Sequence, residues 1–153
     1  MPPLNRDQET DHILEMFDGN RAAIMTMLER QFTVLHNRAQ VLLGLCGIVV
    51  TTTGFSGRLI AGTSRPAQWL IVMGVVLVLT AAALVVVGVL HLWWLTQHPG
   101  ESTRDWLGHA LGYRDRKTRF YRFAIVLMLA GLVFYVAAIA LMLLNPASAP
   151  ISR

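Results

Sequence analysis

The stretch that decides the fold is WLIVMGVVLVLTAAALVVVGVL, residues 69–90. None of its 22 residues is ionisable, and fourteen of them are Leu, Ile or Val. The hydrocarbon core of a bilayer is about 30 Å thick, and a helix needs roughly 20 residues to cross it. At about 1.5 Å per residue, this stretch makes a helix of roughly 33 Å. The pattern therefore predicts a helix that spans a membrane.

Two further apolar stretches lie on either side of it in the sequence. Residues 123–144 form a stretch of 22 residues without a charge, and residues 39–55 form one of 17. Because 17 residues are short for a bilayer, we expect the first span to continue to residue 60, with the Arg58 guanidinium reaching the interface. The expected spans are 39–60, 69–95 and 120–144.

The composition also favours an integral membrane protein. Charged residues make up 14% of the 153 and apolar residues 54%, whereas a soluble domain carries about 25% charge. The single cysteine, Cys46, excludes an internal disulfide, and we expect it to pack inside the first span. The fold class that follows is all-α: a polytopic membrane protein with three transmembrane helices, the first of which extends into the cytosol.

Basic residues are distributed unevenly along this topology. The segments before the first apolar stretch and between the second and third hold ten of the thirteen Lys and Arg residues. Positive charge favours the cytoplasmic side. We therefore expect segment 1–38 and loop 96–119 in the cytoplasm and tail 145–153 outside, in a multi-pass protein of a cell inner membrane.

Short amphipathic helices are expected on the cytoplasmic side. Asn5 and Gln8 have the spacing of a capping box for a helix that ends near Phe17. Asp18-Gly19 is expected to end this helix. A second helix then begins at Asn20 and continues into the first span. Ser102 or Thr103 begins another short helix, which Gly112 is expected to stop.

An apolar seam follows the second of these helices at alternating spacings of three and four. It consists of Met25, Leu28, Phe32 and Leu35, and it continues into the span at Ala39, Leu42 and Cys46. We expect this seam to be covered in part by the short helix with Trp106, Leu107, Ala110 and Leu111. The remainder, with Trp106, is expected to dock a second copy or another subunit; the alternative is that it lies against lipid headgroups.

Small residues form a stripe on the first span. Gly44, Gly47, Thr51 and Gly54 recur at three and four residues, and Gly74, Ala81 and Gly88 make a matching line on the second span. Transmembrane helices pack closely over small side chains. We expect the first span to pack through this stripe.

No pattern in the sequence predicts catalysis or a metal site. Nucleophile-elbow, zinc-protease, phosphate-loop and Cys-x-x-Cys motifs are absent. His12 and Glu15, with Asp11 beside them, lie one helical turn apart but lack a second cluster to complete a coordination shell. We expect no enzyme activity, no metal and no small-molecule substrate.

Two features near the membrane surface allow alternatives. His91 could ligate haem iron or chlorophyll magnesium, but we expect an interfacial histidine and no cofactor. The basic residues before the third span are expected to contact anionic headgroups rather than nucleic acid; these are Arg114, Arg116, Lys117, Arg119 and Arg122.

Two segments resemble small bacterial membrane effectors of the SLATT and Pycsar types. NRAQVLLG, residues 37–44, leads an amphipathic helix into the first span, and KTRFYR, residues 117–122, precedes the last. The whole chain also resembles uncharacterised three-span bacterial membrane proteins. The resemblance implies an oligomerising, membrane-perturbing effector of a defence or signalling system.

Two functions are therefore expected as alternatives. The uncharged spans and the lack of a catalytic pattern favour a non-catalytic accessory subunit of a larger membrane complex, such as a respiratory or photosynthetic one. The seam and the resemblance favour the effector. In both cases the partners are the lipid bilayer and either other membrane subunits or further copies of the chain.

Overall fold

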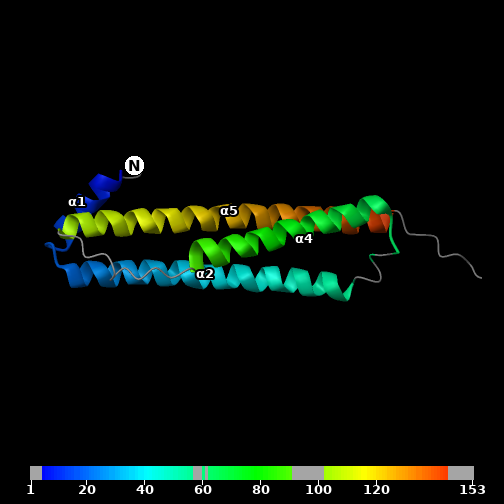
Figure 1. Ribbon diagram of the computed structural model, residues 1–153, viewed down its shortest axis with the longest axis horizontal. Helices are drawn as coiled ribbons and strands as arrows, with labels where there is room; N and C mark the ends of the chain where they lie inside the picture. Colours follow the sequence, from blue (N-terminus) through cyan, green and yellow to red (C-terminus); the bar gives the residue numbers. More distant parts are fainter. Residues whose placement is uncertain (1–4, 57–59, 61, 91–101, 145–153) are drawn as a thin grey trace, which may run out of the picture.

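The computed structural model describes residues 5–56, 60, 62–90 and 102–144, which form a long helical bundle (Figure 1). The helices are α1 (Arg6–Met16), α2 (Arg21–Phe55), α4 (Arg65–Val85), the π-helical turn η1 (Val86–Leu90) and α5 (Thr103–Leu144). The described residues contain no strand. Helices α2 and α5 extend along the bundle, α4 lies between them over one half, and α1 lies at the opposite end (Figure 1).

Three of these helical segments are long and apolar enough to cross a membrane: α2, α4 with η1, and α5. Their apolar parts lie together in one half of the bundle (Figure 1). Large apolar side chains on the outside of that half are exposed, among them Val87, Val133 and Leu143. The predicted all-helical fold with three such helices is confirmed.

Local sequence signals set the first two helices as expected. The Asn5 side chain accepts a hydrogen bond from the Arg6 backbone N–H at 2.7 Å. In the capping box it also accepts from the Gln8 backbone N–H, and the Asn5 N–H donates to Gln8 Oε1 at 3.1 Å. The following turn uses left-handed backbone at Asp18 (φ 50°) and Gly19 (φ 69°). Asn20 then caps α2.

The ends of the expected spans differ in part from the structure. Helix α2 ends at Phe55 with Ser56 as its C-cap, which is before residue 60, where the first span was expected to end. Arg58 lies outside the described residues. Helix α4 with η1 is described to Leu90, and the remainder of the expected span to residue 95 is not. Helix α5 is described to Leu144.

The expected helix stop at Gly112 is wrong, because α5 continues unbroken from Thr103 to Leu144. A glycine ends a helix when it adopts left-handed backbone, and among the described glycines Gly19 alone has a positive φ. Within a helix a glycine costs only about 1 kcal/mol relative to alanine. The space left by the missing side chain faces the Arg6 guanidinium, 3.4 Å from an ideal Cβ at Gly112.

Two separate cores hold the bundle together. The apolar-half core joins α2, α4, η1 and α5 through small and branched side chains: Ala39, Leu42, Cys46, Val78, Ala81, Val85, Val89, Ala124 and Met128. The polar-half core joins α1, α2 and α5 through Ile13, Ile24, Leu28, Trp106, Leu107, Ala110 and Leu111. Because α2 and α5 contribute to both cores, each is a rigid connection between the two halves.

Candidate functional site

The tightest approach of backbones in the apolar half is between α4 and α5. An ideal Cβ at Gly74 would lie 2.9 Å from the Gly131 carbonyl oxygen, and one at Gly131 would lie 2.8 Å from the Gly74 carbonyl oxygen. Farther along α4, a Cβ at Gly88 would lie 2.7 Å from the Phe120 ring. The glycine line of the second span therefore packs against the third span, and its expected match with the first span is wrong.

Helix α2 contacts this pair through a different face from the one expected. Ala39, Leu42 and Cys46 are buried against α4 and α5, whereas an ideal Cβ at Gly44, Gly47 or Gly54 would meet nothing within 4 Å. Thr51 is exposed as well. We call Gly44, Gly47, Thr51 and Gly54 the glycine face of α2. Among the described residues, the glycine face packs against no other helix.

In the polar half, the seam of α2 is largely covered by the chain itself. Leu28 and Trp106 are both buried in the polar-half core, as an intramolecular contact requires. Phe32 packs against that core and Leu35 against the apolar-half core, while Met25 is 41% exposed. Most of the residues expected to dock a partner are thus already in contact with other residues of the same chain.

The cover comes from residues that the sequence pattern did not single out. Ile13 of α1 is buried, with Leu14 and Phe17 packed beside it. At the start of α2, Ile24 is fully buried whereas its neighbour Met25 is exposed. The signal was present, because Ile13, Leu14 and Phe17 share one face of the first helix.

Arg114 joins all three helices of the polar half. Its guanidinium forms a two-pronged ion pair with Glu9 of α1, at 2.7 and 2.9 Å. It also donates to Gln31 of α2 at 3.3 Å and to Asp115 at 2.9 Å. Hydrogen bonding to Glu9, with smaller contributions from Asp115 and from both negative charges, outweighs desolvation and raises the pKa of the Arg114 guanidinium.

Lys117 is buried next to this group. Its ammonium lies 4.7 Å from the centre of the Tyr113 ring and 6.0 Å from that of Phe32, and the two rings are 6.0 Å apart. A cation over aromatic faces is stabilised by the ring quadrupole. Lys117 therefore ties α5 to α2 instead of facing outward.

Three of the five basic residues expected to meet headgroups are exposed. Arg116, Arg119 and Arg122 lie on the surface of α5 just before its apolar part, whereas Arg114 and Lys117 are engaged inside the bundle. His91 lies outside the described residues.

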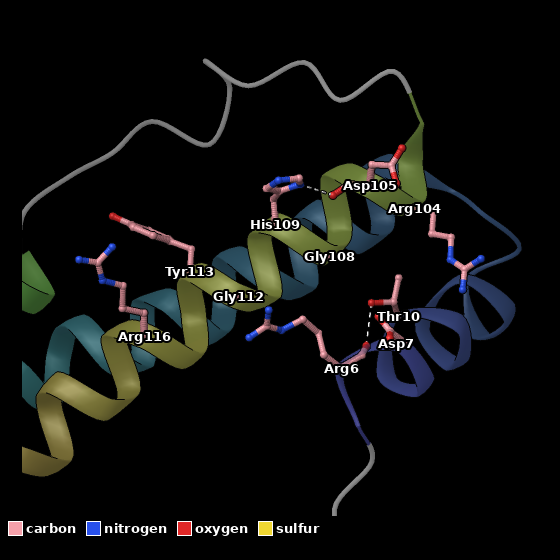
Figure 2. Close-up of a pocket in the computed structure, with 10 residues that line it drawn as sticks. All are labelled: Arg6, Asp7, Thr10, Arg104, Asp105, Gly108, His109, Gly112, Tyr113 and Arg116. Carbon is pink, nitrogen blue, oxygen red and sulfur yellow. Dashed lines mark hydrogen bonds between the residues drawn. The ribbon is translucent and has the colours of Figure 1, made fainter.

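An open cleft of about 600 Å³ lies between α1 and the start of α5 (Figure 2). Gly108 and Gly112 line it on α5, and the charged residues around it are of both signs: Arg6, Arg104, Arg116, Asp7 and Asp105. The His109 Nδ1–H donates to the Asp105 carbonyl at 2.8 Å. The charged side chains around the cleft, three basic and two acidic, are therefore nearly balanced.

No group of three or more His, Cys, Asp or Glu side chains that could hold a metal ion occurs in the described residues. Asp11, considered above with His12 and Glu15, instead pairs with Arg104 at 2.9 Å. A scan against protein-family models finds no match for the chain, and neither the curated proteins nor the solved structures contain a significant match. The resemblance to the SLATT and Pycsar types accordingly stays a prediction.

Proposed function

We propose that the chain is an integral inner-membrane protein and a non-catalytic accessory subunit of a larger membrane complex. In this proposal α2, α4 with η1, and α5 are its three spans. The N-terminus and the polar half lie in the cytoplasm, and the C-terminus lies outside.

The exposed arginines support this placement in the bilayer. Arg116, Arg119 and Arg122 lie within seven residues at the start of the apolar part of α5. At this level they meet the headgroups of a bilayer around the apolar half. Each basic residue near an anionic surface contributes about 1 kcal/mol of attraction.

The observation that carries the accessory-subunit proposal is the uncovered glycine face of α2. Lipid tails are as apolar as leucine, so helices associate in a membrane through close backbone contact over small residues. On α4 and α5 the closely packed glycines Gly74 and Gly131 face each other, but no helix in the described part of the chain packs against the three glycines of the α2 face. A helix of another subunit fits there.

Gly47→Leu tests this proposal, because a leucine has open space in the chain itself yet blocks close approach of a second helix. The protein is purified from native membranes in mild detergent, and its co-purifying subunits are measured by mass spectrometry. We expect Gly47→Leu to lose a stoichiometric partner while the monomer stays folded. Thr52→Leu is the matched control, since Thr52 is exposed on a different face of α2. Equal recovery of the partner with both variants would refute the proposal.

The second candidate function is the oligomerising, membrane-perturbing effector. It is supported by α2 and α5, which continue without a break from the α1 end of the bundle into the apolar half. A change at the polar end can therefore be transmitted to the spans. For this function the purified protein would be a homo-oligomer, and overexpression would collapse the membrane potential of the cell.

A further inference from the structure

Helix α1 is attached to the rest of the bundle by ion pairs and by a short apolar contact. Three ion pairs connect it to α5: Glu9 with Arg114, Asp11 with Arg104, and Arg6 with Asp115. The side chains of the last two pairs are 38–58% exposed, and exposed pairs contribute little and are screened by salt. The Glu9–Arg114 pair is the more buried one, with 27% and 21% exposure.

The apolar contact of α1 comes from the C-terminal end of the helix and the residue that caps it. The helix has 11 residues and buries two side chains, Thr10 and Ile13. The Thr10 hydroxyl donates to the Arg6 carbonyl within the same helix. Ile13 is therefore the one buried apolar side chain of α1, and the partly buried Leu14 and Phe17 pack beside it against the polar-half core. An isolated helix of this length is marginal in water. Helix α1 therefore unfolds whenever it leaves α5.

The connection between α1 and α2 allows such a departure. It consists of the turn at Asp18 and Gly19, both in left-handed backbone. Helix α2 has its own N-cap, because the Asn20 side chain accepts from the Ala22 and Ala23 backbone N–H groups at 3.1 and 3.3 Å. The start of α2 thus remains capped without α1.

We infer that α1 is a detachable cap, which ion pairs hold closed on α5. The closed cap covers the polar-half core, and breaking the ion pairs uncovers it. The inference goes beyond the proposed function and does not depend on it. The uncovered surface belongs to α2 and α5 and includes Ile24, Leu107 and Leu111, which are fully buried while the cap is closed.

Hydrogen–deuterium exchange of the full chain in lipid nanodiscs tests the cap. Raising NaCl from about 0.1 M to about 1 M shortens the screening length from about 10 Å to about 3 Å. We expect the amides of residues 6–16 to exchange about tenfold faster at the higher salt concentration, as loss of several weak ion pairs predicts. The amides of 107–111 and of 70–85 should change far less, because α5 and α4 stay helical.

Glu9→Gln separates the ion pair from a general loss of charge. Asp7→Asn is the matched control: it removes a carboxylate from the same helix turn, and no ion pair of Asp7 occurs within the described residues. We expect Glu9→Gln to speed exchange of α1 at low salt about tenfold and Asp7→Asn to leave it nearly unchanged. Equal exchange in the two variants, or exchange of α1 that is independent of salt, would overturn the inference. Loss of protection in 107–111 together with α1 would also overturn it, since α1 would then be an integral part of the bundle.

Discussion

Replacing Gly131 with alanine tests the packing of the apolar half at its closest point. The new Cβ would lie 2.8 Å from the Gly74 carbonyl oxygen and 2.9 Å from Val78 Cγ2. Real Cβ atoms are essentially never found this close to a neighbour, and one of the two contacts is with backbone. Helices α4 and α5 must therefore move apart at the crossing.

The size of the effect follows from two opposing contributions. Overpacking a well-filled site costs about 1–3 kcal/mol. Alanine in place of glycine favours the helix by about 1 kcal/mol. The control is Gly108→Ala, in the same helix, where an ideal Cβ meets nothing within 4 Å. Both variants gain the helix preference, so the difference between their free energies of unfolding should be about 1–3 kcal/mol.

The assay is unfolding by SDS in mixed micelles, followed by circular dichroism of the helical signal. We expect Gly131→Ala to unfold at a lower SDS fraction than the wild type and Gly108→Ala at an equal or higher one. If Gly131→Ala is as stable as Gly108→Ala, the close crossing of α4 and α5 does not exist.

Three other predictions concern the polar half and its boundary. Lys117→Met should change the free energy of unfolding by less than about 1 kcal/mol, since methionine keeps the buried apolar part of the side chain. Lys117→Glu should lower the free energy of unfolding by more than about 2 kcal/mol, because it places a carboxylate next to two aromatic rings. SDS unfolding measures both changes. Cysteines placed at Leu28 and Trp106 should form an intramolecular crosslink on oxidation, seen as a shift of the monomer band, and a crosslink that forms only between chains would contradict the polar-half core. Arg119→Glu should weaken retention of anionic lipids in native mass spectrometry, and unchanged retention would mean that this side chain does not meet headgroups.

The sequence was most informative where a signal was local. Asn5 with Gln8 predicts the first cap, and Asp18-Gly19 predicts the first turn, because each depends on backbone chemistry within a few residues. Length and hydrophobicity predict the three long helices because the apolar residues of each span follow one another in the sequence. The stop predicted at Gly112 failed because a glycine permits a left-handed turn without requiring one.

Pairing between distant residues could not be predicted from one sequence. Glu9 and Arg114 are 105 residues apart, and nothing in the spacing of either selects the other among the many charges. The same limit applies to the glycines. A stripe of small residues on α2 and a line on α4 suggested a match, yet α4 uses Gly74 against the single glycine Gly131, since one close crossing needs only one small residue on each helix.

The topology of the chain tests the central claim of this account most directly. Reporter fusions are made after Thr103, before the third span, and after Arg153, at the end of the chain. A reporter active only in the cytoplasm and one active only outside it are used at both positions. The account predicts that Thr103 is cytoplasmic and Arg153 external. Both positions on one side would mean that α5 does not cross the membrane, and the reverse placement would contradict the orientation derived from the basic residues.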